Sequence, residues 1–415
     1  MKKTELKSAA SKAARPNNLS TVVSVSVVII LVLAYLVTIA FTKASVSPTL
    51  TEINTTGYAE TKIVWPAYGQ AAVGAVGYGV LANSGEQVAH PIASIAKIVL
   101  ALSVLEKKPL EAGQSGPSYQ ITSDDVQYYY DDLAVGGSLL PVNDGEVLTE
   151  YQMLQGLLIA SGDNIATTLA VWAFGSMENY LAYANKMAAD NGWSATHMAD
   201  ASGLSDQTVS SAVDLVKIGD KALSHSVLAE IVNQQQADLP IAGTVNNYNT
   251  ILGKDGVIGI KTGNTPEAGG CLLFAVKNAT DSDAPVMVGA ILGAPSRLTV
   301  LRDTTNFIQS NASNFRNINV VKAGNVVGKY ETAWGQSIKI IAKDDLNYYT
   351  VDNKKITPAI TLDKINSSKS KNSEVGTVLV NINGQTKSTS AILNSDLTEP
   401  SYGWKLLHPF RLSFK

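Results

Sequence analysis

A long uncharged run near the N-terminus constrains this chain most, because such a segment has few stable environments outside a lipid bilayer. It covers residues 21–42 and holds no Asp, Glu, Lys or Arg. Twenty helical residues, each rising about 1.5 Å, cross the roughly 30 Å of a bilayer core. Basic side chains precede the run, at Lys2, Lys3, Lys7, Lys12 and Arg15. We therefore expect a cytoplasmic segment at 1–20 and a single membrane anchor at 21–44, with the rest of the chain outside the cytoplasm.

A cleaved signal peptide is the alternative, since Thr42-Lys43-Ala44 loosely fits a cleavage site of small residues. The apolar run is longer than the roughly 7–15 apolar residues of a signal peptide, which favours the uncleaved anchor. Both interpretations export the remainder of the chain.

The exported part is acidic. Residues 1–44 hold six of the 32 basic groups and one of the 35 acidic groups, which leaves 26 basic against 34 acidic groups, a net charge of −8. Nucleic-acid binding calls for a basic surface. The charge therefore argues against a nucleic acid as partner.

Cysteine and histidine usage predicts no metal or other cofactor. Cys271 is the single cysteine and lies in the apolar stretch CLLFAV, which favours a buried structural thiol. The four histidines are scattered, without the spacing of a metal site. They are His90, His197, His225 and His408.

The pattern along the chain predicts an α+β unit followed by a small all-β unit. Residues 45–57 are rich in Ser and Thr and are expected to form a linker. In residues 58–312, the stretches GVIGIKTGN, GGCLLFAVKN and APVMVGAILGA suggest an antiparallel meander, with helices between these and the N-terminal strands. The predicted helices are 92–106, 150–159, 165–174, 177–191 and 212–223. Residues 313–402 alternate as strands do, and 403–415 form a tail.

The first candidate motif opens the most apolar predicted helix of the exported part. Ser94 and Lys97 are three residues apart and share a helix face. A serine hydroxyl becomes a good nucleophile when a base takes its proton, and a lysine serves as that base once burial or a nearby cation lowers its pKa. The alternative is a capping serine beside a surface lysine. The same spacing recurs without meaning at Ser368 and Lys371, in a polar loop.

The second candidate motif is a connector between two apolar helical segments. Ser161-Gly162-Asp163-Asn164 occupies a bend from which polar side chains reach a cleft. The alternative is a cluster of ordinary helix-capping residues.

The third candidate motif, Lys261-Thr262-Gly263, ends a strand-like stretch. Lys261 would hold Lys97 neutral by like-charge repulsion and bind an anion. Thr262 would hydrogen-bond a carboxylate, and Gly263 would let a substrate backbone lie against the strand. An ordinary strand end before a turn is the alternative.

The three motifs in this order are typical of serine acyl-transfer enzymes that react with β-lactams. Further segments, among them LLIASGDNIATTLAVWAFGS, SAVDLVKIGDKAL and ILGAPSRLTVLRDT, follow in the expected order. Over roughly residues 60–310 the chain thus resembles the low-molecular-mass D-alanyl-D-alanine carboxypeptidases, penicillin-binding proteins of the S11 serine peptidase family. The resemblance implies a β-lactamase/transpeptidase-like catalytic domain and, less specifically, a small C-terminal β domain.

The resemblance also implies a function and roles. The expected activity is a serine-type D-Ala-D-Ala carboxypeptidase that trims peptidoglycan stem peptides and is inhibited covalently by β-lactam antibiotics. Ser94 would be the acylated nucleophile, Lys97 its general base and Ser161 a proton relay to the departing D-alanine. Lys261 and Thr262 would bind the substrate carboxylate. The backbone N–H groups of Ser94 and Asn264 would form the oxyanion hole.

One position departs from the family. An asparagine usually stands two residues after the second-motif serine, but here that residue is Asp163 and Asn164 follows. An ionised aspartate donates no hydrogen bond, and its charge would favour protonated Lys97. We expect Asn164 to reach into the site through a local backbone shift. The alternative is that Asp163 serves and activity is weaker.

Two weaker features stay open. The run Tyr128-Tyr129-Tyr130, beside Asp131 and Asp132, would suit stacking on sugar rings, although ordinary packing in a loop or strand is favoured. The tail GWKLLHPFRLSFK has aromatic and basic residues that suit a membrane surface, or packing on the β domain.

Other functions also fit the motifs. A β-lactamase would need a base for deacylation, for which Glu178 is the nearest glutamate after Ser161, although it lies in an amphipathic segment. A wall-binding or sensor protein that kept the fold and lost turnover is a non-enzymatic alternative. Carboxypeptidases and transpeptidases share the acyl-enzyme, so the motifs leave both reactions open.

Overall fold

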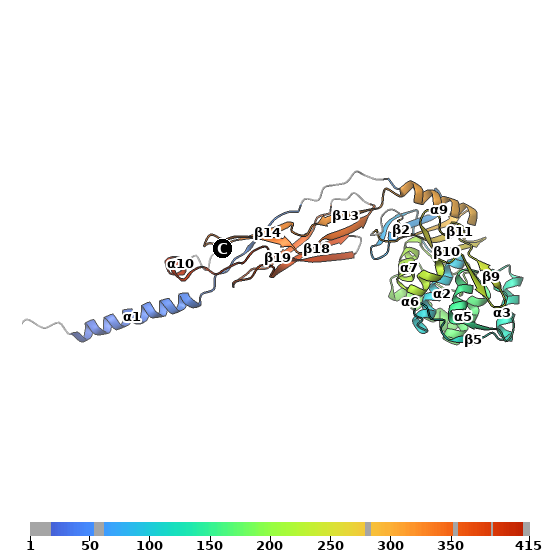
Figure 1. Ribbon diagram of the computed structural model, residues 1–415, viewed down its shortest axis with the longest axis horizontal. Helices are drawn as coiled ribbons and strands as arrows, with labels where there is room; N and C mark the ends of the chain where they lie inside the picture. The colour runs from blue at the N-terminus through green and yellow to red at the C-terminus, as the bar shows by residue number, and fades with distance from the viewer. Residues whose placement is uncertain (1–17, 54–61, 279–283, 352–355, 383–384, 410–415) are drawn as a thin grey trace, which may run out of the picture.

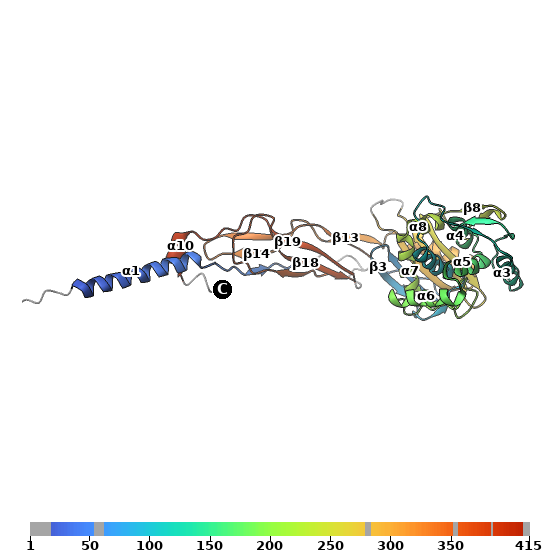
Figure 2. The ribbon, with the colours of Figure 1, turned by 90° about the horizontal axis from the view of Figure 1, so that it is seen from below.

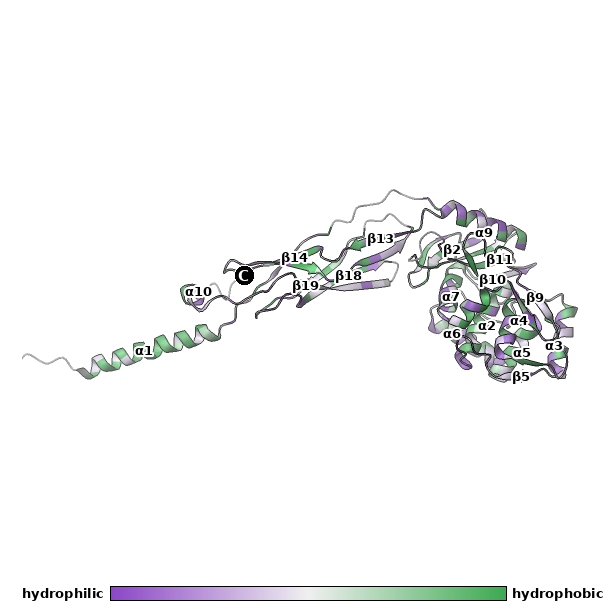
Figure 3. Cartoon of the chain, in the orientation of Figure 1, coloured by the Kyte–Doolittle hydropathy of each residue, from purple (hydrophilic) through white to green (hydrophobic). Residues whose placement is uncertain are grey.

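Three parts follow one another along an elongated molecule (Figure 1, Figure 2). The computed structural model describes residues 18–53, 62–278, 284–351, 356–382 and 385–409. Helix α1, Asn18–Phe41, lies at one end, a β-rich unit in the middle and a unit of helices around a sheet at the other end. Residues 19–41 of α1 form a helix that is long and apolar enough to cross a membrane, and Figure 3 shows α1 as largely hydrophobic. The basic residues before it lie outside the described part of the chain.

The unit at the far end is built on a five-stranded antiparallel sheet, in the order β10-β11-β12-β2-β3. Its strands are β2 Gln70–Ala75, β3 Gly79–Ser84, β10 Val257–Thr265, β11 Gly269–Val276 and β12 Met287–Ala294. Strands from both ends of the unit therefore meet at the pairing of β12 with β2. The predicted meander and α+β class are confirmed.

Helices cover both faces of this sheet. Helix α7 packs on β2, β3 and β12, whereas α9 packs on β11 and β12. The helices are α2 Ala96–Lys107, α3 Ser123–Ala134, α4 Glu150–Leu158, α5 Asp163–Phe174, α6 Met177–Asp190, α7 Ala212–Ser224, α8 Ser226–Val232 and α9 Arg297–Asn311, preceded by the 3₁₀ turn η1 Ala93–Ile95. Short ladders join β4 His90–Pro91 to β7 Val209–Ser210, β5 Ser118–Gln120 to β6 Val147–Thr149, and β8 Gln236–Leu239 to β9 Gly243–Asn246.

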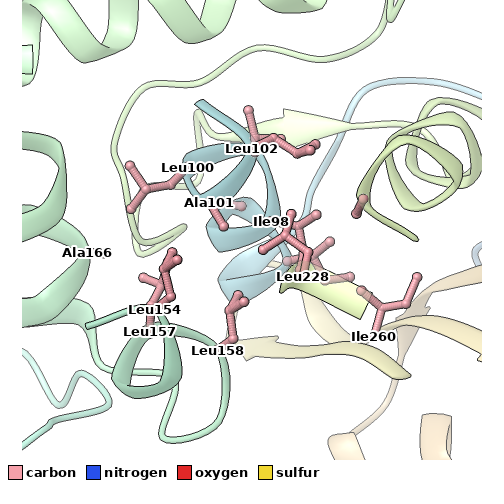
Figure 4. Packing of buried hydrophobic residues seen from close by; sticks show 14 of the residues in the cluster. Ile98, Leu100, Ala101, Leu102, Leu154, Leu157, Leu158, Ala166, Leu228 and Ile260 are labelled. Atoms are coloured by element: carbon pink, nitrogen blue, oxygen red, sulfur yellow. The ribbon is translucent and has the colours of Figure 1, made fainter. Parts of the chain in front are cut away.

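Helix α2 lies in the middle of the core, because its residues 96–105 are all buried. Figure 4 shows its side chains in one cluster with Leu157 of α4, Leu228 of α8 and Ile260 of β10. Burying one such side chain contributes about 1.5–3 kcal/mol. This packing fixes the helix that carries the first motif.

Local capping explains two of the helix starts. Thr149 and Gln152 form a capping box at the start of α4. A second box, of Thr122 and Asp125, starts α3. The tyrosine run 128–130 therefore lies on a helix, and the expected loop or strand there is wrong.

The middle unit is a β domain with its own core. Its main sheet has the order β1-β14-β15-β19-β18-β17, and β13 pairs with β16. The strands are β1 Pro48–Leu50, β13 Arg316–Val321, β14 Val326–Glu331, β15 Ser337–Ala342, β16 Leu346–Thr350, β17 Ala359–Leu362, β18 Glu374–Ile382 and β19 Gln385–Leu393. Buried side chains such as Tyr330, Ile340 and Leu393 fill the core.

The expected linker at 45–57 is wrong over β1, which is an edge strand paired with β14. Val46 also bridges to Ile365 and is buried in the core of the β domain. A three-residue edge strand is stabilised by pairing with strands far along the chain, so its local sequence gives little indication that a strand will form. The chain thus contributes a strand to the β domain before it forms the unit built on the five-stranded sheet.

The described C-terminal segment returns to α1. Helix α10, Tyr402–Leu407, contacts α1 (Figure 1). The Tyr402 hydroxyl donates to the carbonyl of Leu36 over 3.0 Å, and Lys405 Nζ donates to the carbonyl of Thr42 over 3.3 Å. The start of the expected tail therefore packs on the N-terminal helix, while residues 410–415 lie outside the described chain.

Candidate active site

Ser94 and Lys97 meet where η1 passes into α2. Ala93, just before the serine, has φ of 47°, in the left-handed region that non-glycine residues seldom adopt. The Lys97 side chain is fully buried. Its Nζ donates to Ser94 Oγ over 2.8 Å, to Asp163 Oδ1 over 2.5 Å and to the Ser202 carbonyl over 2.9 Å. These three acceptors satisfy the three N–H groups of an ammonium.

Ser161 and Lys261 form a second serine–lysine pair. Lys261 Nζ donates to Ser161 Oγ over 2.9 Å and to the Thr262 carbonyl over 3.1 Å. Ser161 has φ of 57°, also left-handed. Strained backbone of this kind persists where the surrounding fold holds it, often at functional sites.

The two lysines differ in their electrostatic surroundings. Burial, followed by the positive charge of Lys97, holds the pKa of Lys261 well below its usual range. Lys97 has a carboxylate partner, whereas the two hydrogen-bond acceptors of Lys261 are uncharged. Like-charge repulsion from Lys97 thus acts on Lys261, while the converse expectation, that Lys261 holds Lys97 neutral, stays a prediction.

Asp163, and not Asn164, is the residue of the second motif that contacts Lys97. Its Oδ2 accepts the backbone N–H of Ser138 over 2.7 Å, so both carboxylate oxygens have donors. Asn164 instead exchanges two hydrogen bonds with the backbone of Leu140, of 3.0 and 2.9 Å. The expectation that Asn164 enters the site is wrong.

The start of α5 explains this choice. Asp163 is its first residue, where a carboxylate interacts favourably with the helix dipole. Successive helical residues point about 100° apart, so Asn164 faces the 138–140 segment when Asp163 faces Lys97.

The third motif lies on β10, the edge strand of the sheet, against η1. Lys261 and Thr262 are almost fully buried. A Cβ at Gly263 would lie 2.7 Å from the carbonyl oxygen of Ile92 and 3.3 Å from the nitrogen of Ser94. Gly263 therefore allows η1 to approach the strand closely, a structural use beside the expected contact with substrate.

Asn264 and Arg297 sit at the exposed end of β10. The Asn264 side chain accepts the backbone N–H of Arg297 over 3.0 Å. The Arg297 guanidinium lies over the ring of Tyr248, at 4.9 Å, and its charge also lowers the pKa of Lys261. The sequence motifs did not single out this arginine, although it lies in a segment that resembled the family.

Other contributors were also missed from sequence. The Ser202 carbonyl that binds Lys97 lies in a loop organised by Asp200, whose carboxylate accepts the backbone N–H groups of Gly203, Leu204 and Ser205. None of the three sequence motifs includes this loop. Because every residue has a backbone carbonyl, residue types do not reveal which carbonyl binds Lys97.

The arrangement can carry out nucleophilic acyl transfer. A serine hydroxyl lies within hydrogen-bonding distance of a buried lysine, which is the geometry of a nucleophile with its base. Glu178 is exposed in the first turn of α6. Within the described residues, no group of three or more His, Cys, Asp or Glu side chains is placed to hold a metal ion.

Comparisons with known proteins agree with this geometry. A model of the family Peptidase S11, D-alanyl-D-alanine carboxypeptidase, matches residues 72–296, more than half of the chain. The D-alanyl-D-alanine carboxypeptidase DacF of Bacillus subtilis is 26% identical over 323 residues, 75% of this chain and 79% of that protein. DacA of Escherichia coli is 24% identical over 347 residues, 81% of this chain and 84% of that protein. Penicillin binding protein 5 of Haemophilus influenzae shares the fold, with a TM-score of 0.60 and 17% identity over 82% of this chain and 99% of that one.

Proposed function

This chain belongs to the S11 family and is a serine-type D-alanyl-D-alanine carboxypeptidase, and on that premise we propose that Ser94 forms the acyl-enzyme through which it shortens peptidoglycan stem peptides. The observation that carries the proposal is the pairing of two serines with two buried lysines. Ser94 bonds Lys97, and Ser161 bonds Lys261.

In the acylation step, Ser94 Oγ attacks the carbonyl carbon of the penultimate D-alanine while Lys97, as a neutral amine, accepts the proton of the Ser94 hydroxyl. The developing oxyanion is held by the backbone N–H groups of Ser94 and Asn264. A donor of this kind typically contributes about 2.7–4 kcal/mol to transition-state stabilisation. The close approach of η1 to β10, which Gly263 permits, supports this pairing of donors.

The departing D-alanine needs a proton on its amine, and Ser161 is placed to supply it. Ser161 would pass on the proton that Lys97 took from Ser94. The Ser161 hydroxyl accepts a hydrogen bond from Lys261, whose pKa is held well below its usual range by burial and by the charge of Lys97. The terminal carboxylate of the substrate binds Lys261 and Thr262, aided by the charge of Arg297. Water then hydrolyses the acyl-enzyme.

The N-terminal helix and the charge of the chain indicate the cellular location and the partners of the enzyme. We place α1 in the cell membrane as a single-pass anchor, with the catalytic unit on the extracytoplasmic side, where peptidoglycan lies. The length and apolar character of residues 19–41 support this placement. β-Lactams acylate the same serine and act as covalent inhibitors. Nucleic acid is not a partner, given the acidic exported part.

The test is release of D-alanine from diacyl-Lys-D-Ala-D-Ala by the full chain in detergent, with Ser94→Ala as control. We expect release from the wild type and none from the variant. Adding glycine as an amine acceptor separates hydrolysis from transfer, because transfer yields a new amide product. Release that persists in Ser94→Ala, or a folded wild type that neither releases D-alanine nor binds penicillin covalently, would refute the proposal.

A further inference from the structure

Asp132 is a second carboxyl group at the back of the candidate site, and none of the roles above uses it. It lies near the end of α3 and is half-buried, and no donor among the described residues reaches its buried Oδ2. Asp163, by contrast, has a donor on each oxygen. Buried polar atoms without partners are rare and mark functional or strained positions.

Gly137 separates the two carboxyl groups. Its N–H donates to the Asp132 carbonyl over 2.8 Å. A Cβ at Gly137 would lie 2.7 Å from Asp163 Oδ2 and 3.3 Å from the Cβ of Asp132. Because glycine has no Cβ, the two carboxyl groups can lie on either side of one small residue, behind the Lys97–Asp163 pair.

We propose that Asp132 is a positioning residue that acts through Asp163, its negative charge favouring transfer of a proton from Lys97 to Asp163 and so freeing the Lys97 amine to activate Ser94. The inference rests on the proposed function of Ser94 and Lys97. It gives this chain a relay of lysine and carboxylate in place of the family's lysine and amide.

The protons balance along the relay. A proton leaves Lys97 Nζ for Asp163 Oδ1, 2.5 Å away, and the ion pair becomes an amine and a carboxylic acid. The amine takes the proton of Ser94 Oγ as the oxygen bonds to the substrate carbonyl carbon. When the carbon–nitrogen bond breaks, that proton passes through Ser161 to the departing amine. Lys97 is again an amine, ready to accept a proton from the hydrolytic water.

The charges around Asp132 give the sign of its effect. Burial, and then the negative charge of Asp163, raise the pKa of Asp132 to about 6, while Lys97 lowers it less, and Asp131 and Asp200 add small increases. Asp132 thus interacts more strongly with Asp163 than with Lys97. A proton that moves from Lys97 to Asp163 is attracted more strongly by the negative charge of Asp132 after the move than before it. An ionised Asp132 therefore favours the transfer. Below pH 6 the charge, and the benefit, are lost.

The experiment measures acylation of the full chain by a fluorescent penicillin between pH 5 and 8.5. We expect the wild-type rate to rise through about pH 6. Asp132→Asn should lose this rise and be slower at pH 7.5 by roughly three- to tenfold, as a weak charge interaction predicts, while matching the wild type at pH 5. Asp132→Glu should restore the rise.

Asp131→Asn is the matched control, because Asp131 is the exposed neighbour on the same helix and is bonded by Gln127. It should keep the wild-type profile. The inference would be overturned if the wild-type acylation rate showed no inflection near pH 6, a result that does not depend on any variant folding. It would also be overturned if Asp132→Asn had the same pH profile as Asp131→Asn. A wild type that is not acylated at any pH would instead contradict the function of Ser94.

Discussion

Lys97 Nζ lies 2.5 Å from Asp163 Oδ1, and the two side chains are 0% and 2% exposed. A buried ion pair recovers its desolvation cost only when both groups have further hydrogen bonds. Lys97 donates to Ser94 Oγ and to the Ser202 carbonyl, and Asp163 accepts the backbone N–H of Ser138. The pair is therefore stabilised by its surroundings, and it lies beside the serine that we propose as the nucleophile.

Removing the acidic half of this pair should impair folding and chemistry together. Asp163→Ala leaves Lys97 as an uncompensated buried charge, so we expect a loss of about 3–5 kcal/mol in unfolding free energy. Penicillin acylation should also slow by roughly a hundredfold, as for the loss of a proton acceptor. Thermal unfolding and acylation kinetics measure the two effects.

Asn164→Ala is the comparison for that variant. It removes two hydrogen bonds to the Leu140 backbone, so stability should fall by about 1–3 kcal/mol. The folded fraction should acylate within a fewfold of the wild-type rate. Equal loss of acylation in the two variants would contradict the assignment of Asp163 as the functional residue.

Ser161→Ala should slow release of D-alanine by roughly a hundredfold or more, because the amine then leaves without its proton donor. An ester analogue that ends in D-lactate has a better leaving group and should be affected much less. Steady-state kinetics on the amide and the ester measure the difference. If both substrates lose the same factor, Ser161 is not the relay.

Glu150 should make stability depend on pH. It is fully buried, neither carboxylate oxygen is hydrogen-bonded within the part of the chain that the structure describes, and burial raises its pKa to about 7. A raised folded-state pKa favours folding at low pH, and this contribution is lost as pH rises from the unfolded value of 4.5 through about 7. The free energy of unfolding of Glu150→Gln should thus exceed that of the wild type by on the order of 1–2 kcal/mol at pH 8, and by little at pH 4. Urea unfolding at both values tests this, and an equal change at both would count against it.

The motifs were readable in the sequence because each depends on residue type and local spacing. Ser94 and Lys97 share a helix face because they are three residues apart. Thr149, followed three residues later by Gln152, is the pattern of a capping box and indicates where a helix begins. Helix α3 was missed because SDDVQYYYDDLA has little apolar periodicity. It is fixed instead by Asp125, which accepts hydrogen bonds from Tyr119 and Thr168.

Other features depend on contacts between distant segments. The choice between Asp163 and Asn164 depends on the residue at which α5 begins, and a shift of one residue turns the other side chain toward Lys97. Strand β1 exists only through its pairing with β14. Such relationships arise after the chain has folded, so local sequence does not reveal them.

The placement of β1 gives the catalytic unit two covalent connections to the half of the molecule that holds the β domain and α1. One runs from β1 to β2, and the other from α9 to β13. A protease that cut only the first would not release the catalytic unit, since the second still joins it to the β domain and, through α10, to the side of α1. Release of the catalytic unit from α1 would therefore require two independent cuts, or one cut between α1 and β1 together with separation of α10 from α1.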